Sequence, residues 1–311
     1  MEAQLISVIL PVYNGGGYLE EAVQTVLAQE FTNFEFLILD DASTDSSWQY
    51  LASLTDPRIR LFRNERNRGL FYNLNFLANK SRGHLIKLWS QDDRMYPHCL
   101  ERFVAFYHLY PEVGFIYSGR DSIDARGNVR KRNGTDETPR IVSSALHAKI
   151  AFFTGSIAGN IANVCIRKEA FMKVGPFNEE MKISGDFDMW VRLARYYETG
   201  FIPEKLIQLR DHSGQLSRRV DLYINHVKED LEVYRYLQSY VAPAVREEGK
   251  KVMRNHKLVF YYTLMVKALL KRNVSAAYSF YRELARFDNF AVLTFCFLRA
   301  KVLKRRKPDL T

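Results

Sequence analysis

Two adjacent carboxylates follow directly after an apolar run near the middle of the first half of this sequence. Residues 85–89 form the run, and Asp92 and Asp93 come just after it. The run predicts a buried strand, and ligands bind at the carboxyl ends of strands in open α/β sheets. Adjacent carboxylates repel each other unless a positive group lies nearby. A hard divalent cation that also carries phosphate oxygens would supply that charge; alternatively, both side chains cap the helix that starts near Pro97.

Two more predicted strands end in polar side chains. Tyr13 and Asn14 follow the first strand, and Asp40 and Asp41 follow the second. Three such clusters on one edge of a sheet describe a pocket that suits a nucleotide, because Tyr13 can lie against a base and Asp41 can accept a base N–H. The simpler alternatives are a turn at Tyr13 and a helix cap at Asp40 and Asp41.

The elements that position these residues alternate between strand and helix. Apolar runs predict strands at 5–12, 34–39, 59–62 and 84–89, and helical periodicity is found in between, at 18–28, after 44 and at 70–79. This spacing is typical of βαβ units, so we expect an α/β fold with a parallel, doubly wound sheet. The glycines at 15–17 lack the spacing of a dinucleotide fingerprint, and no Gly-Lys-Ser/Thr phosphate loop is present.

Composition limits the class of protein. The chain has 311 residues, and 47% of them are apolar, which is enough for one large α/β domain with a smaller addition. Its three cysteines are scattered, with no metal-type spacing, which favours a reducing compartment. We expect no signal peptide, because the apolar run from Leu5 is short, lacks a basic flank and meets Pro11. We expect no membrane-spanning helix, because no run of about 18 apolar residues is present.

The positive charge is concentrated in the last third of the chain. From Val220 onward there are 18 Lys and Arg against 9 Asp and Glu, so this part carries +9 of the total net charge of +10. We therefore predict two domains, residues 1–219 and 220–311. The pI of about 9.4 alone would suit a nucleic-acid-binding protein. Three acidic strand ends in a nearly neutral first domain argue against nucleic acid as a partner.

Four motifs in this order resemble the family 2 glycosyltransferases of the GT-A fold. They are Ser-Val-Ile-Leu-Pro-Val-Tyr-Asn at 7–14, Leu-Asp-Asp-Ala-Ser-Thr-Asp at 39–45, Asn-Arg-Gly at 67–69 with Asn75, and Ser-Gln-Asp-Asp at 90–93. The resemblance covers roughly residues 5–219. The last motif stands where the family has its metal-binding Asp-x-Asp segment, but its first position is Ser90 here. We interpret that change as loss of a ribose or outer contact, not loss of the metal.

The resemblance implies a set of site residues. Asp92 would be the main ligand of Mn²⁺ or Mg²⁺, together with Asp93 and His212. Asp186, at the start of a predicted helix, would be the general base, although a capping role alone would also explain it. His212 is otherwise a packed or surface histidine. Nucleotide contacts are implied at Pro11, Val12, Tyr13, Asn14, Asp41, Asn75 and Asp92, and diphosphate contacts at Arg210 and Arg218.

The resemblance also implies an activity. It is the transfer, with inversion, of a hexosyl or N-acetylhexosaminyl group from a nucleotide-sugar donor, with a UDP-sugar favoured. The acceptor would be a hydroxyl of a glycan or of a lipid-linked molecule. The reaction would belong to bacterial surface polysaccharide synthesis. The alternative is a catalytically silent GT-A domain that acts as an assembly partner. A sugar nucleotidyltransferase would be expected to show a Gly-rich phosphate loop near its first strand, which residues 11–17 do not resemble.

The C-terminal region is predicted to be helical, over 220–240, 245–272 and 276–304. An apolar stretch at 290–298 precedes Arg299, Lys301 and the basic run at 304–307. An apolar patch beside basic residues fits peripheral attachment to an anionic membrane. We therefore predict a cytoplasmic protein that its C-terminal basic helix holds at the inner face of the membrane. Alternatively, the C-terminal helices bind a partner or form a homo-oligomer.

Overall fold

The computed structural model describes residues 5–130, 138–215 and 222–301. By its internal contacts the chain divides into two compact units. The first is Met1–His147 with Ser156–Arg218, and the second is Ala148–Gly155 with Arg219–Thr311. The predicted boundary at 219 lies in a part of the chain outside the described residues, and the split into domains 1–219 and 220–311 stays a prediction.

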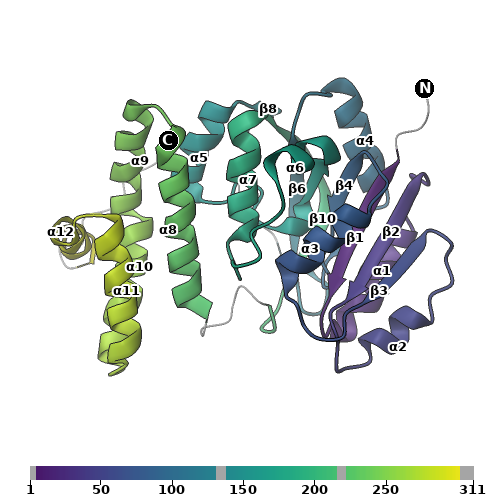
Figure 1. Ribbon diagram of the computed structural model, residues 1–311, viewed down its shortest axis with the longest axis horizontal. Helices are drawn as coiled ribbons and strands as arrows, with labels where there is room; N and C mark the ends of the chain where they lie inside the picture. Colours follow the sequence, from purple (N-terminus) through teal and green to yellow (C-terminus); the bar gives the residue numbers. More distant parts are fainter. Residues whose placement is uncertain (1–4, 131–137, 216–221, 302–311) are drawn as a thin grey trace. The chain divides into compact units, whose positions relative to one another are not determined.

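A ten-stranded sheet forms the centre of the first unit (Figure 1). Its strands run in the order β3-β2-β1-β4-β9-β6-β10-β5, with β7 paired to β6 and β8 paired to β10. Their bounds are β1 Ile6–Val12, β2 Phe34–Asp40, β3 Ile59–Arg63, β4 Leu85–Leu88, β5 Arg94–Met95, β6 Phe115–Asp124, β7 Val129–Arg130, β8 Ile141–Val142, β9 Val164–Arg167 and β10 Thr199–Asp211.

The predicted α/β class is confirmed, and the sheet is mixed. Strands β3, β2, β1 and β4 are parallel neighbours, as the βαβ spacing predicts, and β6 and β10 form a second parallel pair. Strand β9 lies antiparallel between β4 and β6 and joins the two parts. Every residue of β1, β2 and β4 is buried, which explains why these strands are apolar on both faces.

Helices pack around this sheet (Figure 1). Leu19, Val23 and Val26 of the first long helix are buried in the core with β1 and β2, which accounts for their helical spacing. The helices of this unit are α1 Leu19–Leu27, α2 Ser47–Ala52, α3 Leu70–Lys80, α4 Cys99–Leu109, α6 Lys168–Val174 and α7 Gly185–Tyr196, with short 3₁₀ turns at Gly16–Tyr18 and Ile161–Asn163.

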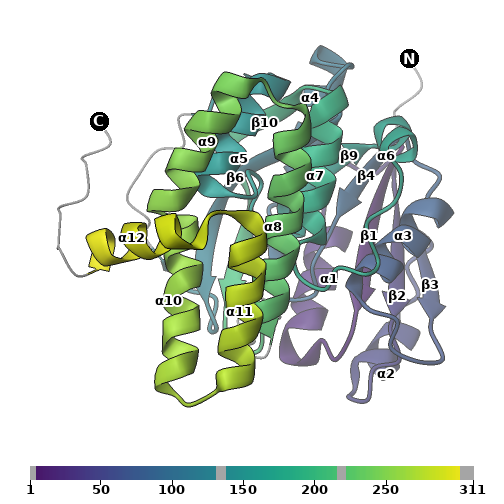
Figure 2. The same ribbon diagram turned by 60° about the vertical axis from the view of Figure 1, so that its left-hand side comes forward.

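The second unit is helical. The predicted helix at 245–272 is interrupted at His256, whose backbone leaves the helical region, and the one at 276–304 is interrupted near Asp288. The C-terminal helices of the second unit are α8 Tyr223–Tyr240, α9 Pro243–Asn255, α10 Lys257–Leu270, α11 Val274–Phe287 and α12 Phe290–Lys301 (Figure 2). Within the described residues, no helix has both the length and the apolar character needed to cross a membrane.

Helix α5, Ser144–Thr154, contributes residues to both units. Its second half packs with the C-terminal helices: the Phe152 ring stacks on Tyr234 with centroids 6.0 Å apart, and the Tyr234 hydroxyl donates to the Ala151 carbonyl at 3.1 Å. A Cβ on Gly249 would lie 2.6 Å from the Phe152 ring, so this glycine allows the close approach of α9. The charge pattern did not predict that residues 148–155 would group with the C-terminal helices.

His147, on α5 in the first unit, makes folding depend on pH. Its side chain is buried, and neither ring nitrogen has a hydrogen-bond partner among the described residues. Burial lowers the pKa of His147 from 6.5 to about 4. Between pH 6.5 and 4, His147 is therefore protonated in the unfolded chain but not in the folded chain. As the pH falls through this range, the free energy of unfolding decreases.

We expect His147→Leu to flatten this pH dependence. Between pH 7 and 4 the free energy of unfolding of the wild type should fall by about 3 kcal/mol more than that of the variant, since 1 pKa unit corresponds to about 1.4 kcal/mol. Urea unfolding of both proteins at several pH values measures the difference. Parallel curves would show that the folded protein accepts this proton without cost.

Candidate active site

Asp92 and His212 meet although 120 residues separate them. Asp92 lies in the turn after β4, and His212 directly follows β10. The His212 Nε2 and Asp92 Oδ2 atoms are 2.9 Å apart, and Ser90 Oγ donates to the other carboxylate oxygen. The ring of Tyr18 lies 4.9 Å from that of His212. The structure thus brings together two of the three residues that the sequence analysis assigned to a metal.

Arg210 is a buried bridge that holds these two segments together. Its Nε donates to the Asp92 carbonyl at 2.9 Å, and its Nη1 donates to the Asp124 and Ala125 carbonyls, each at 3.3 Å. Its Nη2 donates to Glu21 on α1, and the guanidinium lies 4.4 Å from the centre of the Tyr18 ring. The expected diphosphate contact at Arg210 is therefore not supported, because the side chain is buried and its donors are already used.

Asp93 is turned into the protein. Its Oδ1 accepts the Arg210 backbone N–H at 2.8 Å, and the side chain is buried. Burial, and then the neighbouring charge of Asp92, raise the pKa of Asp93 to about 8. Its burial and its bond to the Arg210 N–H favour a role as an anchor of the turn, and the metal-ligand role of Asp93 stays a prediction.

Tyr13 stands exposed at the end of β1, with 45% of its surface accessible. Its backbone is held by Gln91, whose Oε1 accepts the Tyr13 N–H at 2.9 Å and whose Nε2 donates to the Tyr13 carbonyl at 3.1 Å. The sequence analysis missed Gln91. Its place between Ser90 and Asp92, in the turn after a buried strand, was the available signal.

The loop after β1 is fixed by the loop after β2. Ser43 and Asp45 accept the backbone N–H groups of Asn14 and Gly16 at 2.9 and 3.0 Å, and the Asn14 side chain accepts the Thr44 N–H at 2.8 Å. Asn14 and Ala42 have positive φ angles of 50° and 59°. Such conformations in residues other than glycine persist where the surrounding contacts enforce them, and they are frequent at functional sites.

Asp41 anchors a neighbouring loop. Its Oδ1 accepts from Asn64 Nδ2 at 2.7 Å and from the Arg68 N–H at 2.8 Å, and its Oδ2 accepts the Gly69 N–H at 2.9 Å. Gly69 has a φ of 88°, which suits glycine, at the start of α3. The carboxylate predicted to accept a base N–H therefore holds residues 64–69 in place.

Pro11, Val12 and Asn75 occupy interior positions. Pro11 and Val12 are buried in β1, and the Val12 carbonyl accepts the Asp41 N–H at 2.7 Å. The Asn75 amide accepts the Phe177 N–H at 2.8 Å and donates to the Phe177 carbonyl and to Glu179, each at 2.9 Å. These contacts favour structural roles for Val12 and Asn75 over the predicted nucleotide contacts. Arg218 lies outside the described residues.

Asp186 lies in the first turn of α7 and is partly exposed. Its Oδ1 accepts the Phe187 N–H at 2.7 Å. The preceding Gly185 permits close packing of the helix start, because a Cβ there would lie 2.6 Å from the Phe71 ring. Asp188 differs from Asp186, since it pairs with Arg192 at 2.8 Å and burial raises its pKa.

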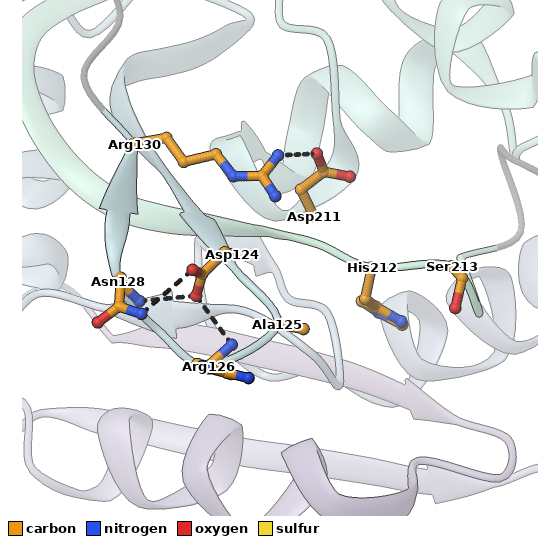
Figure 3. Close-up of a pocket in the computed structure, with 8 residues that line it drawn as sticks. All are labelled: Asp124, Ala125, Arg126, Asn128, Arg130, Asp211, His212 and Ser213. Atoms are coloured by element: carbon orange, nitrogen blue, oxygen red, sulfur yellow. Dashed lines mark hydrogen bonds and ion pairs between the residues drawn. The ribbon is translucent and has the colours of Figure 1, made fainter.

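A cavity of about 620 Å³ opens beside His212 (Figure 3). The turn between β6 and β7 forms one wall, where the Asp124 carboxylate accepts the N–H groups of Arg126 and Asn128. Arg130 pairs with Asp211 at 2.5 Å on another side. The sequence analysis did not predict this cavity. Its lining comprises Asp124, Ala125, Arg126, Asn128, Arg130, Asp211, His212 and Ser213.

Asp92 and His212 could hold a divalent cation. Carboxylate oxygen and imidazole nitrogen are both common ligands of Mn²⁺, and Mg²⁺ and Mn²⁺ in phosphate sites often take few protein ligands because the substrate supplies the others. Within the described parts of the chain, no group of three or more His, Cys, Asp or Glu side chains is placed to bind a metal. The pair therefore fits a cation shared with a phosphate ligand better than a closed protein site.

Sequence comparisons place this chain among glycosyltransferases. Residues 7–174 match the model of glycosyl transferase family 2. An uncharacterized glycosyltransferase of Rickettsia conorii is 31% identical over 227 residues, which are 72% of this chain and 36% of that protein. The putative glycosyltransferase EpsE of Bacillus subtilis is 29% identical over 70% of this chain and 77% of EpsE. The match spans about a third of the length of the Rickettsia conorii, felis and bellii proteins.

Solved structures confirm the predicted GT-A type of fold. TarS 1-349 of S. aureus in complex with UDP-GlcNAc superposes with a TM-score of 0.71 at 15% identity, over 98% of this chain and 94% of that one. The mannosyltransferase PcManGT of Pyrobaculum calidifontis, in complex with GDP-Man and Mn²⁺, gives a TM-score of 0.61 at 14% identity, over 96% and 88%. At these identities the likeness shows the fold alone.

If Asp41 anchors residues 64–69, Asp41→Asn should destabilise the protein in the absence of any nucleotide. The amide places an N–H₂ group among three donors, so we expect a loss on the order of 3 kcal/mol in the free energy of unfolding. Glu101→Gln, an exposed change whose nearest cation is 4.0 Å away, is the control and should cost less than about 0.5 kcal/mol. Equal stability of Asp41→Asn and wild type would contradict the anchoring role.

Proposed function

Because the chain belongs to glycosyl transferase family 2, we propose that it transfers a sugar from a nucleotide diphosphate donor to an acceptor hydroxyl with inversion. The observation that carries this proposal is the Asp92–His212 pair, 2.9 Å apart at the carboxyl end of β4. It lies beside the turn that also holds Tyr13, the exposed aromatic at the end of β1. A metal-diphosphate site next to a surface for a base is the arrangement that this chemistry needs.

A UDP-sugar is the proposed donor. TarS binds UDP-GlcNAc and UDP, whereas PcManGT binds GDP-Man, and TarS 1-349 with UDP-GlcNAc has the higher TM-score of the two folds. Tyr13 is free to stack on a pyrimidine base. We propose a hexose or an N-acetylhexosamine as the transferred sugar, and a glycan or lipid-linked acceptor in bacterial surface polysaccharide synthesis.

The proposed cofactor is Mn²⁺ or Mg²⁺, held by Asp92 and His212. When bound, such a cation would act as a Lewis acid that neutralises the charge of the nucleoside diphosphate leaving group. Ser90 and Arg210 fix the position of Asp92 through its carboxylate and its carbonyl, respectively. The residues of the chain thus arrange the leaving-group side before any ligand arrives, which lowers the cost of binding.

Asp186 is the proposed general base. In the first turn of α7 the helix dipole and the backbone N–H groups favour its ionised form, which can accept a proton from the acceptor hydroxyl. Attack of that oxygen on the anomeric carbon, from the face opposite the leaving group, forms the new glycosidic bond and breaks the bond to the diphosphate. A single displacement of this kind inverts the configuration.

Replacement of Asp92 should separate its role from that of its neighbour. With a donor first selected by thermal shift from a panel of nucleotide sugars, we expect Asp92→Asn to lower the Mn²⁺-dependent transfer rate about 100- to 1000-fold. Asp93→Asn is the matched control. It keeps the size of the side chain and an oxygen that can accept the Arg210 N–H, and should keep most of the activity. Retained Mn²⁺-dependent transfer in Asp92→Asn would remove Asp92 from the metal site, and equal losses in the two variants would show that Asp93 contributes as much as Asp92.

Asp186→Asn should abolish transfer while leaving donor binding intact, because the amide cannot accept the acceptor proton. Calorimetric titration with UDP and Mn²⁺ measures binding, and acceptor-dependent release of UDP measures turnover. Asp188→Asn in the same helix turn is the control. It breaks the pair with Arg192 and should lower stability more than turnover. Normal turnover by Asp186→Asn would show that another residue is the base. A wild-type protein that binds donor but never transfers its sugar would favour the alternative, a catalytically silent assembly domain.

A further inference from the structure

The turn between α10 and α11 exposes three aliphatic side chains at one end of the second unit. Leu270 is 80% exposed, Val274 is 68% exposed and Leu269 is 52% exposed. Lys267, Lys271 and Arg272 are exposed beside them. We call these six residues the α10–α11 tip. Single exposed leucines are common, but a group of large aliphatic residues on one turn is a feature of interaction sites.

The tip has a fixed conformation. The N–H groups of Arg272 and Asn273 donate to the Leu269 and Ala268 carbonyls, each at 2.9 Å, and Arg272 has a positive φ of 56°. This is a tight helix C-terminus of the Schellman type. The Asn273 side chain then accepts the Ala276 N–H at 3.0 Å and caps α11. The exposed leucines are therefore presented by a rigid turn between two capped helices.

The charge around the tip has one sign. Among residues 257–301, every exposed charged side chain is basic: Lys267, Lys271, Arg272, Arg282, Arg286 and Lys301. The two acids of this stretch are occupied. Glu283 is buried and lies 3.4 Å from Arg282, and Asp288 pairs with Arg254 at 2.6 Å. Lys267, Lys271 and Arg272 therefore place positive charge beside the apolar side chains of the tip.

We propose that the α10–α11 tip docks on an anionic lipid bilayer. The leucines and Val274 would enter the boundary between headgroups and acyl chains, and the long stems of Lys267, Lys271 and Arg272 would reach lipid phosphates. A second copy of the chain is a less suitable occupant. A twofold contact would bring the same basic residues against one another, and lysine is depleted in the core of protein interfaces.

This surface differs from the one predicted from sequence. The sequence analysis placed membrane contact on the C-terminal basic helix, and the basic run at 304–307 lies outside the described residues. Helix α12 also exposes Phe295 and Leu298, but Figure 2 shows that it lies near the other end of the α10–α11 pair from the turn. The tip is therefore a separate site, and it does not depend on the glycosyl transfer proposed above.

Flotation of the full chain with lipid vesicles tests this site. We expect binding to vesicles that contain phosphatidylglycerol and little binding to phosphatidylcholine alone. The double variant Leu269→Glu/Leu270→Glu should lower the partition coefficient roughly tenfold for each leucine. Leu109→Glu/Met172→Glu is the matched control, because it adds the same charge at positions 69% and 57% exposed in the first unit. Equal loss in both double variants, or no vesicle binding by the wild type, would overturn the proposal.

A label at the tip gives a second readout. The three native cysteines are buried, so an environment-sensitive dye on Leu270→Cys reports on this position alone. Its emission should shift to the blue on anionic vesicles and stay unchanged on phosphatidylcholine. Two results together would instead show that a second copy of the chain covers the tip. The first is a blue shift that grows with protein concentration in the absence of lipid. The second is a dimer in sedimentation equilibrium that is lost in Leu269→Glu/Leu270→Glu. Neither assay uses turnover, so a failure of the proposed activity leaves both results interpretable.

Discussion

The candidate site depends on one buried arginine. Arg210 uses its backbone N–H to hold Asp93 and its guanidinium to hold the Asp92 carbonyl, the turn after β6 and Glu21 on α1. A buried guanidinium is costly unless its donors are paired, so these four segments must come together for the charge to be accommodated. The result is that Asp92 faces His212 while its neighbour Asp93 faces inward.

The part of the molecule that could be predicted from sequence is the part set by local pattern. The strands at 6–12, 34–40 and 85–88 are buried on both faces, and such runs are recognisable wherever they occur. The polar residues that end them must then lie on one sheet edge, because neighbouring parallel strands end on the same side. The pairing of Asp92 with His212 needed more than this. It was expected only because the motifs resemble a family, since no local rule connects residues 120 positions apart.

The site predictions that the observed contacts do not favour share a physical reason. Residue type and position near a strand end indicate that a side chain can bind a ligand, but not which way it points. Asp93, Asn75 and Arg210 all lie close to the predicted pocket, and each has its polar atoms bound by other parts of the chain. The antiparallel strand β9 and the cavity at the β6–β7 turn depend on long-range pairing, which the periodicity of a single segment does not contain.

The central claim is that Asp92 and His212 form the protein half of a metal-diphosphate site. A crystal structure of the wild type grown with UDP and Mn²⁺, with the metal located by its anomalous scattering, tests this most directly. The account predicts a single strong peak in contact with Asp92 and with the UDP phosphates, with the uracil ring near Tyr13. A peak elsewhere, or UDP bound away from the ends of β1 and β4, would contradict it.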